Sequence, residues 1–122
     1  MIPKDKFDTE AVERLKMIPA SEVVPLLPEL LTWMQDMNWP VAQPVVELLL
    51  TFPNEITPLI ADVLAGEDDM WIYWSLSELI PKLPFYSKLV LAESVEQIAS
   101  GARGFHEDVV ERAKEALQSF EP

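Results

Sequence analysis

The spacing of apolar residues predicts helices along the whole chain. Near the C-terminus, Val109, Ala113 and Ala116 recur every three or four positions, and charged residues stand between them. This is the period of a helix that buries one side. No stretch of useful length alternates as a strand would. The sequence therefore predicts an all-α fold of about seven helices, over residues 8–18, 25–35, 39–51, 55–65, 69–80, 84–100 and 107–119.

Polar residues and glycines mark the expected helix ends. A side-chain oxygen placed just before a helix accepts a hydrogen bond from a free backbone N–H, and this predicts caps at Asp8, Asn38, Asn54 and Asp68. Pro40 is predicted to lie in the first turn of the third helix, where its missing N–H costs nothing. Gly66 is predicted to end the fourth helix in the left-handed conformation, and Gly101 to end the sixth.

A weak internal repeat suggests how the helices are arranged. The triplet Glu47-Leu48-Leu49 is followed 31 residues later by Glu78-Leu79-Ile80, and Pro53 is followed by Pro84 at the same offset. Repeats of this length are typical of stacked helical hairpins. The pattern predicts one helical-repeat domain over residues 1–122, folded as a short right-handed α-α superhelix. The alternative is a compact antiparallel bundle.

The predicted helix over residues 69–80 is apolar on nearly all sides. At about 100° per residue, one side of this helix carries Ile72, Leu76, Leu79 and Ile80, and the opposite side carries Trp71, Trp74 and Glu78. A helix of this kind is buried on more than one side. We therefore expect it in the middle of the stack.

Composition and charge narrow the classes of function. The chain has no cysteine, which excludes disulfides and thiolate metal sites and fits a cytoplasmic protein. Its 9 basic and 21 acidic residues give a net charge of −12, which disfavours nucleic acids and anionic membranes as partners. No apolar run is long enough to span a bilayer. Solubility is the simplest explanation of the charge, and a basic protein partner is the other.

The predicted turns concentrate acidic and amide residues. In a stack of hairpins the turns lie along one edge, so the sequence predicts that this edge holds Asp36, Asn38, Glu67, Asp68, Asp69 and His106. Such residues cap helices, and the same oxygens bind Ca²⁺ or Mg²⁺ or a basic partner. The sequence supplies no cysteine nucleophile, only one histidine and no phosphate-binding glycine loop. We therefore assign no catalytic, cofactor-binding or metal-binding residue.

The aromatic residues are the second candidate for a binding surface. Trp71 and Trp74, with Tyr73 and Glu78 beside them, would form an acidic aromatic patch that takes up a basic side chain. Trp39, next to the polar turn at Asp36 and Asn38, would extend this surface. The alternative is that the tryptophans fill the layer between hairpins and bond through their indole N–H groups.

Two sequence motifs resemble those of a known family. They are Trp33-x-x-Asp36-x-Asn38-Trp39-Pro40-Val41 and Asp68-Asp69-x-Trp71-x-Tyr73-Trp74-x-Leu76, the latter followed by Leu79-Ile80-Pro81-Lys82-Leu83-Pro84. Over roughly residues 25–100, the chain is similar to a family of small bacterial domains of unknown function that are predicted to be HEAT-like helical repeats. The resemblance implies a fold and carries no functional residue.

These observations favour a non-enzymatic protein-interaction module, a scaffold or adaptor with an acidic, tryptophan-lined face. The residues expected to contact the partner are Asp36, Asn38, Trp39, Asp68, Asp69, Trp71, Tyr73, Trp74 and Glu78. One alternative is a protein or enzyme that binds a small ligand or a divalent metal at the acidic edge. Another is an immunity-type inhibitor that covers a basic toxin.

Overall fold

The computed structural model of the chain describes residues 2–120. Within that range all regular elements are helical and no strand occurs, so the all-α prediction is confirmed. None of the helices in this range is long and apolar enough to cross a membrane. The elements are α1 (Thr9–Leu15), α2 (Ala20–Val23), η1 (Val24–Leu26), α3 (Leu27–Leu31), η2 (Thr32–Gln35), α4 (Ala42–Leu49), α5 (Pro53–Ala65), α6 (Asp69–Trp74), η3 (Ser75–Leu79), η4 (Ile80–Lys82), α7 (Phe85–Ala99) and α8 (Glu107–Gln118).

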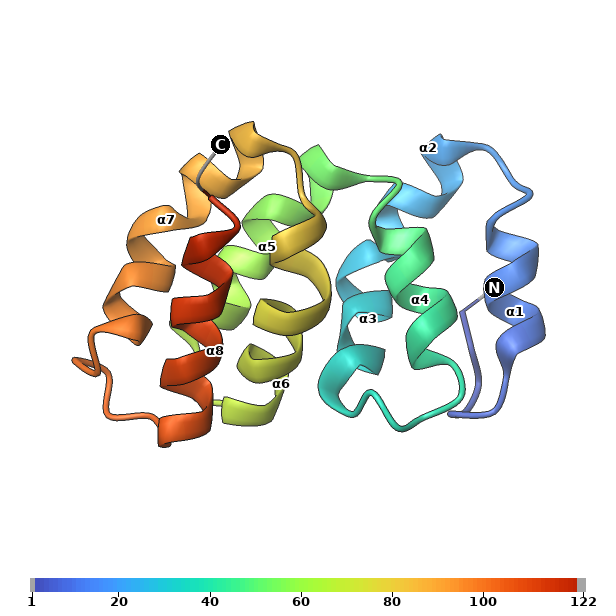
Figure 1. Cartoon of the computed structure of the whole chain (residues 1–122). Helices are drawn as coiled ribbons and strands as arrows, with labels where there is room; N and C mark the ends of the chain where they lie inside the picture. Colours follow the sequence, from blue (N-terminus) through green and yellow to red (C-terminus); the bar gives the residue numbers. More distant parts are fainter. Residues whose placement is uncertain (1, 121–122) are drawn as a thin grey trace.

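The helices form hairpins that stand side by side in one row (Figure 1). The hairpins are α3–α4, α5–α6 and α7–α8. Helix α1 packs against α4, α3 packs against α5, and α5 packs against α7, while α6 contacts both η2 and α8. Consequently α1 lies at one end of the row and α7 at the other (Figure 1).

One apolar core runs through the row. Leu30 and Leu49 belong to the first hairpin, Ile60 to the second and Leu91 to the third, and all four are fully buried members of it. Of the two sides described for residues 69–80, one is completely buried, with Ile72, Leu76, Leu79 and Ile80, and the other, with Trp71, Trp74 and Glu78, is half-buried. With the first side in the core, the remaining side chains of α6 are directed toward the neighbouring helices and the surface.

Local chemistry accounts for several helix ends. Asp8 Oδ1 accepts a hydrogen bond from the Ala11 N–H at 3.4 Å, and Asp68 Oδ1 accepts one from the Trp71 N–H at 3.1 Å. These are the predicted caps of α1 and α6. Gly101 follows the end of α7 with φ of 82°, the left-handed conformation that glycine adopts without steric cost.

Two predicted caps are wrong. The side chain of Asn38 is exposed and caps nothing, and α4 begins only at Ala42. The backbone N–H of Asn38 instead donates to Asp36 Oδ1 at 2.8 Å, a local turn that Asp forms readily. This turn also leaves Pro40 ahead of the helix and outside its first turn. Asn54 lies inside α5, because Pro53 occupies the first helical position and needs no N–H partner there.

The prediction for Gly66 is also wrong. It follows α5 with φ of −85° and ψ of −167°, which is extended backbone. The Arg103 guanidinium donates to the carbonyl oxygens of Leu64 at 2.7 Å and Gly66 at 2.8 Å. A side chain from the α7–α8 connection therefore satisfies the end of α5, and no left-handed residue is needed there.

Two helical stretches are less regular than predicted. The second begins earlier, at Ala20, and changes between α and 3₁₀ geometry near Pro25 and Pro28, because proline has no N–H for the α-helical bond. The stretch after Trp74 is a π-helix over η3. There the Ser77 hydroxyl donates to the Tyr73 carbonyl oxygen at 2.8 Å, and this competes with the regular backbone bond to the same acceptor.

Candidate functional site

The connections within the hairpins lie along one edge of the row, the lower edge in Figure 1. Their polar side chains are used locally. Asp36 binds the N–H of Asn38, Asp68 caps α6, and His106 caps α8 by accepting the Asp108 N–H on Nδ1 at 3.1 Å. Among residues 2–120 no group of three or more His, Cys, Asp or Glu side chains is placed to hold a metal ion. The predicted metal-binding alternative therefore has no ligand cluster in the described structure.

An open cleft lies between α6 and the start of α8. We call it the α6–α8 cleft; its volume is about 500 Å³, and it is lined by Asp69, Met70, Tyr73, Trp74, His106, Asp108 and Val109. The rings of Tyr73 and Trp74 pack edge to face, with centroids 5.0 Å apart and an interplanar angle of 83°. Both aromatic side chains are half-buried. The cleft therefore has a wall of two aromatic rings held at a fixed angle.

Carboxylates from both helices line the same cleft. Asp69 belongs to the first turn of α6 and Asp108 to the first turn of α8, and both side chains are exposed. An acidic residue is stabilised in a first turn by the unpaired N–H groups and the positive end of the helix dipole. The Asp108 carboxylate is 3.6 Å from His106 Nδ1. Local helix chemistry thus favours negative charge on both sides of the aromatic wall.

One arginine of the chain already contacts this aromatic wall. Arg112 places its guanidinium carbon 4.9 Å from the Tyr73 ring centroid, and its Nη2 donates to the Tyr73 hydroxyl at 2.7 Å. Its Nη1 pairs with Glu115 at 3.1 Å. A guanidinium on an aromatic ring with a carboxylate beside it is a favourable cation–π arrangement. The molecule therefore contains an internal example of the contact that this cleft offers to a basic group.

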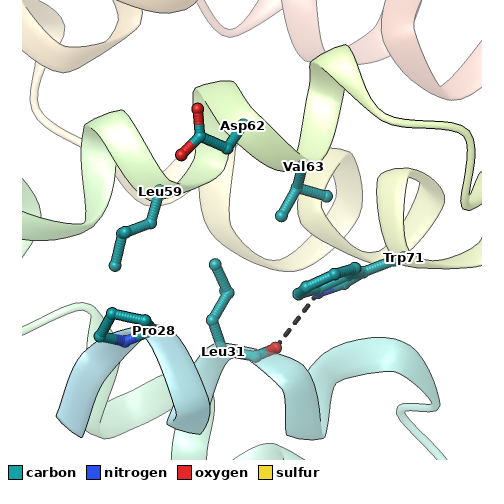
Figure 2. Close-up of a pocket in the computed structure, with 6 residues that line it drawn as sticks. All are labelled: Pro28, Leu31, Leu59, Asp62, Val63 and Trp71. Carbon is teal, nitrogen blue, oxygen red and sulfur yellow. Dashed lines mark hydrogen bonds between the residues drawn. The ribbon is translucent and has the colours of Figure 1, made fainter.

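A second, smaller cleft lies where α3, α5 and α6 meet (Figure 2). We call it the α3–α5–α6 cleft; its volume is about 210 Å³, and it is lined by Pro28, Leu31, Leu59, Asp62, Val63 and Trp71. The Trp71 indole N–H donates to the Leu31 carbonyl oxygen at 3.1 Å, which fixes the ring across the joint between hairpins. Asp62, on the exposed side of α5, supplies the carboxylate.

The structure separates the residues that the sequence grouped. Asp69, Tyr73 and Trp74 share the α6–α8 cleft, whereas Trp71 lines the other cleft. Glu78 pairs with Lys82 at 3.8 Å one turn beyond Trp74. The single aromatic patch expected around Trp71 and Trp74 is therefore divided between two sides of α6.

Of the remaining predicted residues, Asp36, Asn38 and Trp39 lie at the connection between η2 and α4, and Asp68 caps α6; none of them lines either cleft. Trp39 packs edge to face on Trp33, with centroids 5.8 Å apart, and both rings are half-buried. Asp36 and Asn38 form the turn between them. Sequence reasoning missed Asp62 and Asp108 as parts of the clefts. Asp108 follows two residues after His106, which was placed on this edge, but Asp62 becomes visible only once α5 is packed against α3.

Comparison with known proteins gives a family. The model of DUF5071, a domain of unknown function, matches residues 1–120. No curated protein matches the sequence significantly.

Proposed function

The chain belongs to the DUF5071 family of domains of unknown function, and we propose that it is a non-enzymatic protein-interaction module that holds basic side chains of a protein partner. We include in this proposal that the hairpins are HEAT-like repeats and that the protein acts in the cytoplasm. The row of hairpins (Figure 1) and the 31-residue recurrence support the first point. The absence of cysteine supports the second.

The observation that carries the proposal is that α6 supplies a tryptophan to each of two clefts that also contain aspartate. Trp74 stands with Asp69 and Asp108, and Trp71 stands with Asp62. An aromatic face attracts a cation, and a nearby carboxylate pairs with it. Arginine suits such a site better than lysine, because its planar group stacks and bonds at once. The Arg112–Tyr73 contact is the internal example of this geometry.

The overall charge supports the same partner. A net charge of −12 accelerates the approach of a basic protein and repels acidic ones. An inhibitor that covers a basic toxin is one form that such a module takes. The alternative of metal-dependent chemistry has less support, because residues 2–120 contain no cluster of side chains placed to hold a metal ion.

The test is binding of an arginine-rich peptide, nona-arginine, to the pair variant Asp69→Asn/Asp108→Asn and to Trp74→Leu. Loss of one cation–π contact, as in Trp74→Leu, weakens binding about three- to thirtyfold, and loss of two exposed ion pairs of about 0.2–1 kcal/mol each, as in the pair variant, gives a similar range. We expect a loss in this range for each variant, measured by calorimetric titration at physiological salt. Unchanged melting temperatures would show that the fold is retained.

The matched control is Glu10→Gln/Glu13→Gln, which removes the same number of charges from the exposed surface of α1. This control should weaken binding no more than about twofold, because charges away from the cleft act only through the screened field. Equal losses in both pairs would mean that the peptide reads net charge alone, and the proposed site would be wrong. Equal binding of a nona-lysine peptide would remove the preference for arginine.

A further inference from the structure

The first two turns of α7 carry a cluster of exposed apolar side chains. Their exposed fractions are 57% for Phe85, 71% for Tyr86, 59% for Leu89 and 55% for Val90. We call these four residues the α7 stripe. They are half of the large hydrophobic residues that are exposed in residues 2–120. A contiguous cluster of this kind marks an interaction surface, whereas single exposed apolar residues need no explanation.

The other side of α7 is already in the core. Leu91, Val95 and Ile98 are fully buried, and the helix contacts α5 and α8. Helix α7 therefore carries apolar residues toward the protein along its length and, in its first half, also toward solvent; Ser87 and Lys88 are the buried polar residues of that half. A helix with this pattern is usually covered on both sides, and here one side lacks its cover.

The position of α7 makes this pattern unusual. It lies at one end of the row, and α1 lies at the other (Figure 1). In stacked helical proteins the end elements have polar outer faces that close the stack. The exposed surface of α1 follows this rule, with Glu10, Glu13 and Arg14. The exposed surface of α7 begins with the stripe, so the C-terminal end of the row resembles an internal position.

A groove runs beside the stripe. It has a volume of about 640 Å³ and lies between the stripe residues Tyr86 and Val90 on α7 and the exposed surface of α5, with further walls from Asn54, Thr57, Pro58 and Pro84. The groove is open, and Thr57 is the buried residue among these α5 positions, its hydroxyl donating to the Pro53 carbonyl oxygen at 2.6 Å. Side chains of a helix laid along α7 would enter this groove.

The charged residues around the α7 stripe indicate what charge a binding partner should carry. The exposed residues that continue the same side of α7 include Glu93 and Glu96, and the exposed surface of α5 carries Glu55. The only lysine of α7, Lys88, points inward and donates to the Ser119 carbonyl oxygen at 3.0 Å. The border of the apolar surface is thus acidic. A second copy of this chain would bring the same carboxylates and a further −12 charge against it.

We propose that the α7 stripe and its groove are a docking surface for an amphipathic helix of another protein, with an apolar side bordered by lysine or arginine. Such a helix would continue the row as the next element of the stack. Its apolar side would cover Leu89 and Val90, and its basic residues would meet Glu93 and Glu96. This surface is separate from both tryptophan clefts, so it stands on different residues from the proposed function.

The experiment uses the full chain and two synthetic helical peptides. Both carry the same leucine stripe; one is flanked by lysine and the other by glutamate. We expect the lysine peptide to bind, with NMR shift changes centred on residues 85–90, and the glutamate peptide to bind at least tenfold more weakly. The variant Leu89→Gln/Val90→Gln should lose at least tenfold in affinity for the lysine peptide.

Two control variants separate this surface from the others. Met17→Gln changes an apolar residue that is 86% exposed at the opposite end of the row, and it should bind as the wild type does. Asp69→Asn/Asp108→Asn alters the α6–α8 cleft, which by the proposed function takes basic side chains itself, so its readout is the NMR shift changes centred on residues 85–90, and these should persist. Their loss in this variant, with unchanged binding by the stripe variant, would overturn the inference.

Other occupants give different results. Dimerisation in sedimentation that the Leu89→Gln/Val90→Gln variant abolishes would make a second copy the occupant and overturn the proposal. Binding of neutral or anionic lipid vesicles through the stripe would overturn it in the same way. Equal affinity for the lysine and glutamate peptides would show that the acidic border plays no part.

Discussion

Helices α1 and α7 lie at the two ends of the row (Figure 1). Their inward sides are similar, but their solvent-facing sides differ. Toward the protein they are alike, since Val12 and Leu15 of α1 and Leu91 and Val95 of α7 are all buried to 1% exposure or less. Toward solvent α1 presents charged residues and α7 presents the apolar stripe. Only the inward residues of each helix are needed for the core. The difference between the outward residues of α1 and α7 therefore indicates different roles for the two ends.

The two ends are also fastened differently. In the C-terminal half, Arg103 binds the last carbonyls of α5, and Lys88 binds the Ser119 carbonyl after α8. These bonds join residues more than thirty positions apart.

At the N-terminal end the long-range links are the hydrogen bond from the Val41 N–H to the Lys6 carbonyl oxygen at 3.1 Å and the partly exposed pair of Lys16 with Glu47 at 3.6 Å. The charged groups within α1 form exposed pairs such as Arg14 with Glu10 at 3.8 Å, which contribute little to stability. The C-terminal end thus combines long-range hydrogen bonds from Arg103 and Lys88 with an uncovered apolar surface.

Truncation of the inward residues should have the largest effect and should be similar at both ends. Leu15→Ala and Leu91→Ala each remove a fully buried side chain, and each should lower the free energy of unfolding by about 2–5 kcal/mol. Urea denaturation followed by circular dichroism measures this. Leu89→Ala, at a position two residues before Leu91 and on the outward side, should change it by less than about 1 kcal/mol. A loss from Leu89→Ala as large as that from Leu91→Ala would mean that the stripe belongs to the core.

Removal of the fastening should have an intermediate effect. Arg103→Met keeps the aliphatic stem and deletes the bonds to the Leu64 and Gly66 carbonyls. Because hydrogen bonds from a charged group contribute about 1.5–3 kcal/mol in total, we expect a loss of this size in urea denaturation. Arg14→Met, which deletes the exposed pair of α1, should cost at most about 1 kcal/mol. Equal losses would contradict the difference in fastening between the two ends.

The sequence predicts the features that depend on neighbours along the chain. Asp8 and Asp68 cap their helices because the N–H that each accepts lies three residues ahead. The prediction that Val109, Ala113 and Ala116 form the buried side of α8 is confirmed for a similar reason, because the spacing of apolar residues along one helix is local. Asn38 failed as a cap even at this level, because Asp36 forms a competing turn with its N–H.

Features that join distant segments were beyond the sequence. The α3–α5–α6 cleft requires Trp71 to meet Leu31 across the joint between hairpins, and the end of α5 is satisfied by Arg103, which lies 39 residues after Leu64. The apolar residues of the α7 stripe stand in the sequence, but the sequence alone does not show that they face solvent. The meaning of the stripe depends on α7 lying at the end of the row, which the periodicity of one helix does not determine.

The smallest expected effect concerns the N-terminal caps of the two end helices, α1 and α7. Asp8 caps α1, whereas Pro84 precedes α7 and offers no side-chain cap. The hydrogen bond from the Lys4 backbone N–H to Asp8, with a further one from the Ala11 N–H, lowers the pKa of this carboxyl below its ordinary value of 3.8. The folded state therefore favours the ionised form. The resulting stabilisation is fully present above the ordinary pKa and is lost as the pH falls through the lowered value.

The variant Asp8→Asn keeps a capping oxygen and removes the titration. We expect its stability near neutral pH to be close to that of the wild type, and its decline below pH 3.8 to be shallower. Urea denaturation over a series of acidic pH values measures the two slopes, and NMR titration of the Asp8 carboxyl gives its pKa directly. Because α7 begins without a titrating cap, the difference should be confined to the α1 end and be visible as earlier amide exchange there in the wild type at low pH. Parallel pH profiles for the two proteins, or an Asp8 pKa at its ordinary value, would show that the ionised cap does not distinguish the two ends.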